Sequence, residues 1–309
     1  MKLRAYLLML AVVAVWGATF VVVKAALADA TPAAFNLIRM VLAFAILAVV
    51  YRRHWSRIGR RQLAVGALVG LCLAFGYQFQ TTGLVRTTPS KSAFITGLLV
   101  VLVPFLSLIP GLHVPGTRRP GWSAFAGAFL AFAGILLLTV PATASGLSSA
   151  SLLPDFSSIN VGDLLTLGCA VGFAFHCLAI ARVSPQIDYQ PLALLQVGFC
   201  ALFMALSLPL IERPQIHWTP RLAAALIIAA VFATAAAFAI QSWVQSVLPP
   251  THTAIIMTME PAFAWITSFL VLGERLGIRP AIGAGLILAG IVLTELIPSS
   301  PHMPSDHEA

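Results

Sequence analysis

The sequence predicts an all-α polytopic membrane protein, with about ten transmembrane helices arranged as two inverted five-helix repeats. Three observations lead to this prediction: the composition, the spacing of the apolar segments and an internal repeat. Of the 309 residues, 60% are hydrophobic and 9% are charged, and the mean hydropathy is +0.96. Soluble domains are about one quarter charged. This chain therefore cannot be covered by a solvated surface, and lipid must surround most of it.

Ten segments of the sequence are long and apolar enough to cross a bilayer, whose hydrocarbon core of about 30 Å needs roughly 20 helical residues. They are residues 6–27, 33–51, 63–83, 92–112, 121–141, 162–181, 190–211, 222–247, 252–272 and 280–298. Pro249 and Pro250 divide the apolar stretch that holds the eighth and ninth segments, because proline stops a helix. The first segment continues without a small-residue cleavage site, so we expect an uncleaved span rather than a signal peptide.

The chain also matches itself. Residues 126–135 align with residues 282–291, and six of the ten positions are identical. Two glycines stand seven residues apart in each stretch, so each pair lies on one helix face and permits close helix approach. These pairs are Gly127 with Gly134 and Gly283 with Gly290. The predicted domains are a first five-helix repeat (1–141), a connecting loop (142–161), a second five-helix repeat (162–298) and a polar cytoplasmic tail (299–309).

The positive charges indicate topology and not a nucleic-acid partner. The formal net charge is +8, but lysine and arginine stand in short loops, above all in residues 52–61 with their five arginines. Short basic loops stay in the cytoplasm, so we expect both termini there. In the second half of the chain the excess of lysine and arginine falls on the opposite side of the membrane, as expected when the second repeat has the inverted orientation. No folded basic face is left to bind nucleic acid.

Several short motifs occur within these segments. They are Trp16-Gly17-Ala18-Thr19-Phe20 with Lys24, Arg39 in the second span, Ala93-Phe94-Ile95-Thr96-Gly97 running to Val103-Pro104, Glu260-Pro261, and Gly273-Glu274-Arg275. With these motifs the sequence resembles the EamA-type branch of the drug/metabolite transporter superfamily, from about residue 6 to 297. The resemblance implies ten helices, an inverted repeat, a bacterial-type plasma (inner) membrane, and export or uptake of small metabolites by alternating access.

Glu260 is the most informative single position. It lies near the middle of its span, where a charged carboxylate costs at least about 2.5–3.5 kcal/mol. Pro261 removes a helical hydrogen bond beside it, and Pro104 stands in the corresponding span of the first repeat, so both prolines are predicted helix breaks. Glu260 is a candidate for substrate binding or proton coupling. The alternative is that it caps the distortion made by Pro261 or pairs with a buried arginine.

Polar and aromatic residues in other spans could complete a central site. Ala74–Gln78 matches Ala237–Gln241, which makes Gln78 and Gln241 equivalent by repeat and candidates for a cavity wall or for contacts between helices. Candidate aromatic walls include Trp16 and Tyr77. His176 could relay protons, although a core histidine with satisfied hydrogen bonds is the more common situation.

Two basic residues are interpreted as structural or gating charges. Arg39, inside the second span, should face the bundle interior and find a structural partner there, with substrate binding as the alternative. Lys24, at the end of the first span, can extend its ammonium group to the headgroups, or else gate the pathway or attract anions.

The sequence contains no Walker loop, no HExxH motif and no Ser-His-Asp grouping, and its four cysteines form no CxxC pair. We therefore expect no cofactor, no metal and no catalytic residue. The expected function is secondary active transport, as an exporter of small organic metabolites such as amino acids or their derivatives, in a monomer, with protons as a candidate coupling ion. Broad-specificity drug efflux is the alternative, followed by a membrane scaffold or a membrane-embedded enzyme.

Overall fold

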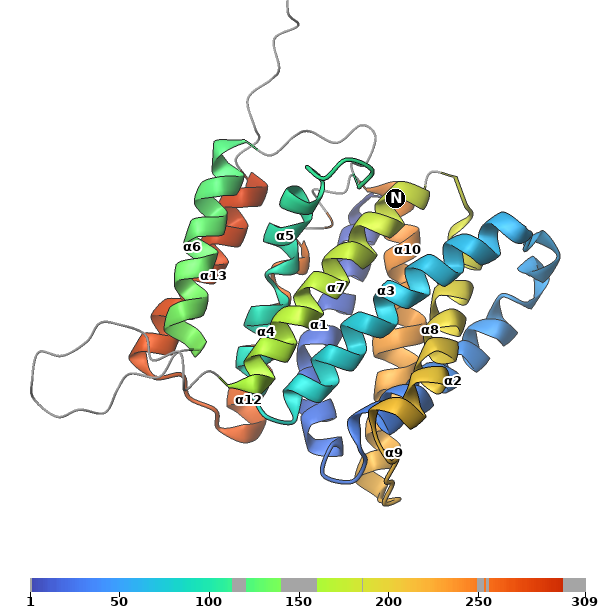
Figure 1. Ribbon diagram of the computed structural model, residues 1–309, viewed down its shortest axis with the longest axis horizontal. Coiled ribbons are helices and arrows are strands. Elements are labelled where there is room, and N and C mark those ends of the chain that lie inside the picture. The colour runs from blue at the N-terminus through green and yellow to red at the C-terminus, as the bar shows by residue number, and fades with distance from the viewer. Residues whose placement is uncertain are drawn as a thin grey trace, which may run out of the picture.

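A computed structural model describes residues 2–112, 121–139, 160–184, 186–248, 253 and 256–296 (Figure 1). Within these residues the secondary structure is helical, apart from one isolated bridge between Ala30 and Ile216. Six helices are long and apolar enough to span a membrane, and four shorter apolar helices accompany them. The prediction of an all-α membrane protein with about ten helices is confirmed.

The first repeat contains five spans. They are α1 (Lys2–Ala26), α2 (Pro32–Val50), α3 (Arg60–Leu84), the broken pair α4 (Pro89–Thr96) and α5 (Leu99–Leu106), and α6 (Trp122–Thr139), with the short η1 (Arg52–Arg57) between α2 and α3. Two of these helices begin with the dipeptide Thr-Pro, at Thr31 and at Thr88. Proline suits the first helical position because that residue's N–H has no helical partner.

The second repeat has the same order. Its helices are α7 (Val161–Val183), α8 (Tyr189–Ile211), α9 (Pro220–Ile227) continued by η3 (Ile228–Ala236) and α10 (Ala237–Val247), then α12 (Glu260–Leu272) and α13 (Ile278–Leu296). Thr219 caps α9 by accepting a hydrogen bond from the Leu222 N–H. The segment η3 is a nine-residue π-helix, so the eighth span changes its winding in the middle.

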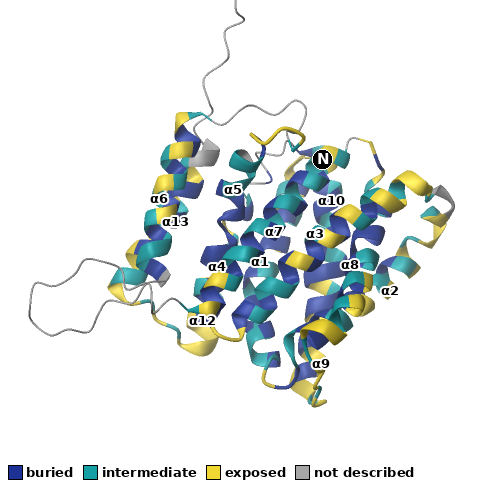
Figure 2. Cartoon of the chain, in the orientation of Figure 1, coloured by how far each residue is buried: buried dark blue, intermediate teal, exposed yellow. Residues whose placement is uncertain are grey.

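Exposed residues lie on the outer faces of the helices (Figure 2), and many of them are large and apolar. Phe129 on α6, Leu210 on α8 and Leu270 on α12 are 72%, 87% and 73% exposed. Buried side chains concentrate between the helices, where Met9, Phe35 and similar residues are fully enclosed. Large apolar side chains on the outside are what a helix bundle needs when lipid is its solvent.

The glycine pairs found in the sequence form the contact between α6 and α13. A Cβ atom at Gly283 would lie 2.6 Å from the Gly134 carbonyl oxygen, and one at Gly290 would collide with the Gly127 carbonyl oxygen. The two helices are therefore antiparallel. In the alignment of the two repeats, Gly127 corresponds to Gly283 and Gly134 to Gly290. The contact between Gly134 and Gly283 is therefore equivalent to the contact between Gly127 and Gly290. A two-fold relation between inverted repeats produces this pattern.

The remaining helix contacts follow the same two-fold relation. Helix α1 of the first repeat packs against three elements of the second repeat, α12, η3 and α10. Its equivalent in the second repeat, α7, packs against three helices of the first, α4, α5 and α3. The second helices of the repeats, α2 and α8, pack against each other. Contacts between the repeats thus bring α1, α3, α7 and α10 to the middle of the molecule (Figure 1).

One end of the bundle is closed by loops from both repeats; we call it the Lys24 end, because α1 ends there. The Asp29 carboxylate accepts hydrogen bonds of 2.8 Å from Arg221 Nε and from Arg221 Nη2, and one of 2.7 Å from the Thr219 hydroxyl. The backbone N–H groups of His217 and Thr31 join the same two loops. These hydrogen bonds lower the pKa of Asp29 below its ordinary value, with Arg221 as the largest cause.

The close contact between α6 and α13 predicts a difference between two glycines of one helix. Gly283→Ala places a methyl group 2.6 Å from the Gly134 carbonyl oxygen and 2.8 Å from the Leu138 nitrogen. Neither backbone atom can yield easily, so we expect a loss of stability of roughly 1–3 kcal/mol, measured as a lower Tm in detergent. Gly285→Ala is the control, since nothing lies within 4 Å of its added Cβ. Equal Tm values for the two variants would contradict the packing.

The Asp29–Arg221 pair predicts a pH dependence of stability. A carboxyl group with a lowered pKa in the folded state stabilises the fold above its unfolded pKa and loses this effect as the pH falls through the folded pKa. The Tm of Arg221→Gln should therefore fall furthest below that of the wild type at neutral pH. This Tm difference should shrink below pH 3.8, the ordinary pKa of an aspartate such as Asp29. A difference that stays constant down to acid pH would show that Arg221 acts through some other contact.

Candidate functional site

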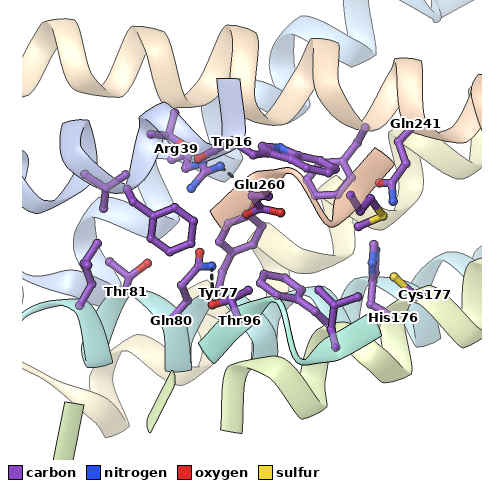
Figure 3. Close-up of a pocket in the computed structure, with 18 residues that line it drawn as sticks. Trp16, Arg39, Tyr77, Gln80, Thr81, Thr96, His176, Cys177, Gln241 and Glu260 are labelled. Atoms are coloured by element: carbon purple, nitrogen blue, oxygen red, sulfur yellow. Dashed lines mark hydrogen bonds between the residues drawn. The ribbon is translucent and has the colours of Figure 1, made fainter. Parts of the chain in front are cut away.

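A cavity of about 60 Å³ lies where α1, α2, α3, α7, α10 and the start of α12 meet, with room for several water molecules. Its walls come from both repeats. The lining residues are Trp16, Thr19, Phe20, Val23, Arg39, Tyr77, Gln80, Thr81, Leu84, Thr96, Leu99, Phe173, His176, Cys177, Phe238, Gln241, Met257 and Glu260 (Figure 3).

Five of the six residues that the sequence proposed for the site, Trp16, Tyr77, His176, Gln241 and Glu260, are among these lining residues. The aromatic ones pair across the repeats. Trp16 of α1 packs on Phe238 of α10 with ring centroids 5.8 Å apart. The related pair, Phe173 of α7 and Tyr77 of α3, has centroids 5.2 Å apart. The cavity therefore lies near the axis that relates the two repeats.

Gln78 is the exception, because it does not line the cavity. Its Oε1 accepts a hydrogen bond of 2.8 Å from Asn36 Nδ2 on α2. One residue further along a helix turns the side chain by about 100°, so a neighbour of Tyr77 faces elsewhere. Gln80, three residues after Tyr77, faces the cavity as Gln241 does three residues after Phe238. The prediction that Gln78 is the counterpart of Gln241 on the cavity wall was therefore wrong. Gln80 occupies that position.

Arg39 reaches the cavity from α2 and is held by neutral groups. Its Nε donates to the Thr234 hydroxyl at 2.7 Å, and its Nη2 donates to the Tyr77 hydroxyl at 3.0 Å and to the Ala233 carbonyl at 3.3 Å. The guanidinium carbon also lies 4.3 Å from the centre of the Tyr77 ring. Among the described residues no carboxylate forms an ion pair with Arg39. The expected burial of this charge is observed, but its partners are uncharged.

The π-helix η3 supplies these partners. Its wider winding displaces backbone carbonyls from the usual helical pattern. The Ala233 carbonyl accepts both from Arg39 and from Trp16 Nε1, the latter at 2.9 Å. The Thr234 hydroxyl accepts from Arg39 Nε and donates to the Ala229 carbonyl at 2.8 Å. Arg39 and Trp16 thus depend on the same irregular segment.

Glu260 is the first residue of α12, and Pro261 occupies the first turn. A tight turn precedes the helix, in which the Met259 N–H donates to the Ile256 carbonyl at 3.1 Å. The interruption that the sequence placed at Pro261 is therefore present. Within the described residues the Glu260 carboxylate makes no hydrogen bond and no ion pair. In Figure 3 it projects into the cavity between Trp16 and Tyr77.

Pro104, a predicted helix break, does not mark the interruption of the corresponding span. Helix α5 runs through Pro104, whereas the interruption lies at Gly97 and Leu98 between α4 and α5. There the Leu98 N–H donates to the Ile95 carbonyl, as in a tighter 3₁₀ turn. A Cβ at Gly97 would lie 3.0 Å from the Pro261 ring. The two interrupted spans thus meet beside the cavity.

His176 is a buried member of a short polar chain. Its Nε2 lies 2.9 Å from Gln196 Oε1, and Gln196 Nε2 donates to the Ser242 hydroxyl at 3.4 Å. The histidine has a satisfied ring nitrogen as well as a place on the cavity wall, so both interpretations from the sequence stay open.

Lys24 lies at the Lys24 end, beside the wall of the central cavity, and lines a second cavity. Its ammonium group donates to the carbonyls of Leu84 at 2.7 Å, Val85 at 2.9 Å and Thr87 at 3.0 Å, at and just after the end of α3. Leu84 lines the central cavity, while Lys24 and Val85 line a second cavity of about 380 Å³ beyond it, together with Arg86, Lys91 and Glu274. These hydrogen bonds therefore lie on the boundary between a vestibule and the central cavity.

Four polar residues of the wall, Thr19, Gln80, Thr81 and Thr96, were missed from the sequence. Gln80 Nε2 reaches the Thr96 hydroxyl at 3.5 Å on the wall of the cavity. The spacing aromatic-x-x-Gln, present at Tyr77 and again at Phe238, was the signal that could have found Gln80. No group of histidine, cysteine, aspartate or glutamate with the geometry of a metal site occurs in the described residues.

The fold and the cavity define an integral membrane protein in which two inverted repeats enclose a polar space between them. Comparison with known families gives the same answer: the EamA-like transporter family matches residues 3–140 and 160–296, one match for each repeat. The chain belongs to this family, so it is a transporter with a small-molecule substrate in a lipid bilayer. The family is one of transporters and not of enzymes.

Named relatives agree with this assignment. An uncharacterized transporter of Archaeoglobus fulgidus is 30% identical over 282 residues, covering 91% of this chain and 82% of the relative. The uncharacterized transporter YvbV of Bacillus subtilis is 24% identical over 94% of this chain and 92% of its own length. A solved crystal structure with 18% identity superimposes with a TM-score of 0.64 over 95% of this chain and 96% of that one, which supports the fold.

Proposed function

We propose that this transporter is a secondary active exporter of small organic metabolites, such as amino acids or their derivatives. The observation that carries the proposal is Glu260, a carboxylate without a partner in the described residues, on the wall of a cavity between two repeats. A charge left unpaired among apolar helices is costly, so it indicates a position that a ligand or a proton completes.

Alternating access between the repeats is the mechanism that the two-fold arrangement supports. The cavity has equivalent walls from both halves, so rocking one half against the other can open it to either side in turn. We propose residues 1–141 and 162–298 as the two moving halves. Segments 142–161 and 299–309, called connecting loop and tail from the sequence, lie almost wholly outside the described residues. The hydrogen bonds of Lys24 at one end support a gate there.

Protons are the proposed coupling ion, with Glu260 as their carrier. The carboxylate can be neutralised either by a proton or by a cationic group of the substrate. Because one site serves both, inward proton movement can drive outward movement of substrate. Aromatic walls such as Trp16, Phe173 and Phe238 favour a second candidate, efflux of hydrophobic drugs. Transport of uncharged aromatic compounds would support that alternative.

The proposed location is a bacterial-type plasma (inner) membrane, with both termini in the cytoplasm and a monomer as the working unit. We expect reporter fusions at Ala309 and within the loop at Ser148 to report opposite sides of the membrane, because the arginine-rich loop 52–61 sets the orientation. Fusions that report the same side would contradict the orientation and the proposed ten-span order.

The coupling role of Glu260 is tested by Glu260→Gln in proteoliposomes. The substitution keeps the shape of the side chain and removes its titration. We expect the variant to lose accumulation driven by a pH gradient, by about tenfold or more, and to retain exchange of substrate at equal concentrations.

Glu212→Gln is the control, since this residue follows α8 outside the cavity and its carboxylate accepts a hydrogen bond from the Ala34 N–H in the first turn of α2. If Glu260→Gln concentrates substrate as the wild type does, Glu260 is a structural partner of the Pro261 break.

A further inference from the structure

The second cavity, of about 380 Å³, lies at the Lys24 end of the bundle, and we call it the vestibule. Five helices meet around it: α1, α3 and α12 end there, and α4 and α7 begin there (Figure 1). Four of its ten lining residues are charged, in a chain of which only 9% is charged. Three of the four are basic, Lys24, Arg86 and Lys91, and one is acidic, Glu274. A cleft with an excess of one sign of charge attracts ions of the opposite sign.

The acidic residue of the vestibule is bound to hydroxyl groups and not to the basic residues. Glu274 Oε2 accepts a hydrogen bond of 2.8 Å from the Ser90 hydroxyl of α4 and another from the Ser268 hydroxyl of α12. Within the described residues Glu274 forms no ion pair. Its carboxylate thus connects the end of α12 to the start of α4, and one negative charge in the lining stands against three positive ones.

Two of the basic side chains have partners that leave their charge in place. The Lys24 ammonium group donates to three backbone carbonyls at and after the end of α3. Lys91 Nζ lies 3.9 Å from Asp163 Oδ2, which is too far for a hydrogen bond. Asp163 is 3% exposed and is not a lining residue, and its Oδ1 accepts a hydrogen bond from the Thr87 hydroxyl. The N–H donors of the Lys91 ammonium group are therefore available to a guest in the vestibule.

Arg86 has a fixed backbone and an unused side chain. Its N–H donates to the Gly83 carbonyl at 2.9 Å, and its carbonyl accepts from Asn160 Nδ2 at 2.6 Å. The guanidinium group, with five N–H donors, forms no ion pair among the described residues although Arg86 lines the vestibule. The chain thus holds the base of this side chain in place and leaves its donors to the cavity.

The helices that begin at the vestibule add to its positive potential. Thr88 precedes α4 and Asn160 precedes α7, and both residues line the vestibule. The N-terminus of a helix carries a partial positive charge. At α3, which ends there, the last carbonyls are covered by the Lys24 ammonium group. The helix ends and the side chains therefore favour the same kind of guest, one with a negative charge.

We propose that the vestibule is a binding site for an oxyanion, the carboxylate or phosphate group of a small molecule, with Arg86 and Lys91 as the residues that bind it. A guanidinium group binds an oxyanion through two parallel N–H donors, and an ammonium group adds a point charge. The volume of about 380 Å³ leaves room for the rest of a small molecule. Neither Glu260 nor a coupling ion takes part in this site, so it goes beyond the proposed function and is tested separately.

The first experiment measures the binding of inorganic phosphate and of acetate to the purified protein in a neutral detergent. Thermal unfolding is followed as each anion is added at constant ionic strength, with sodium chloride as the balancing salt, because a ligand of the folded state raises Tm. We expect a saturable rise in Tm with phosphate, acetate or both, which also tells whether the guest carries a phosphate or a carboxylate group. The dissociation constant should increase about tenfold or more in Arg86→Gln and in Lys91→Gln.

Arg213→Gln is the matched control, since it removes a cation from an exposed position at the same end of the bundle, outside the vestibule. Its dissociation constant should equal that of the wild type. Equal binding in wild type, Arg86→Gln and Lys91→Gln, or no saturable rise in Tm with either anion, would overturn the proposal. If Lys91→Gln does not fold because Asp163 loses its ion pair, Arg86→Gln decides, since no ion pair holds its side chain.

The second experiment separates a soluble anion from the phosphate headgroup of a lipid, which has the same chemistry. Leu272 of the lining is 51% exposed and offers an acyl chain an apolar contact. The phosphate titration is repeated in nanodiscs of phosphatidylcholine with and without phosphatidylglycerol. A lipid in the vestibule raises the apparent dissociation constant of phosphate about tenfold in wild type and leaves that of Arg86→Gln unchanged. An unchanged constant in wild type assigns the site to a soluble anion, and an equal rise in both proteins shows only repulsion by the membrane surface and rules out a lipid in the vestibule.

Discussion

The hydrocarbon interior of a bilayer offers no hydrogen-bond partner, so a polar group inside this chain must be satisfied by the chain or must face a space that holds water or substrate. Most of the buried polar groups follow the first course. Asn36 donates to the Tyr77 carbonyl and to Gln78 and accepts from Thr81, and Gln196 links His176 to Ser242. Glu260 and one nitrogen of Arg39 follow the second, and this division locates the cavity.

Irregular backbone occurs where the same constraint permits it. The turn at Gly97, the start of α12 and the π-helix η3 each leave helical groups without their usual partners, and all three border the cavity or hold its side chains. In η3 the Ala233 carbonyl gains two donors, Trp16 and Arg39, from other helices. The irregular winding is therefore stabilised by tertiary hydrogen bonds, and these bonds fix the two side chains in return.

The features that could be predicted from the sequence are those that a local pattern determines. Apolar length gives the spans, and glycines seven residues apart give the α6–α13 contact, because each depends on one helix at a time. The features that could not be predicted depend on several helices together. Whether Gln78 or Gln80 faces the cavity depends on the rotation of α3, which its neighbours set. The alanine-rich stretch of η3 has no local reason to become a π-helix without Trp16 and Arg39.

The packing of the helices follows the two-fold relation between the repeats, but the charged residues of the cavity do not. Arg39 stands seven residues after the start of α2, and Gln196 stands seven residues after the start of α8, so the second repeat has a neutral amide where the first has a guanidinium. The same repeat offset of 157 residues, which relates Pro104 to Pro261, relates Val103 to Glu260. A symmetric scaffold lets the two halves exchange their open and closed arrangements at similar free energy. A symmetric set of charges would bind a substrate in two opposite orientations. With the cation Arg39 on the first repeat and the anion Glu260 on the second, a charged substrate has one preferred orientation in the cavity.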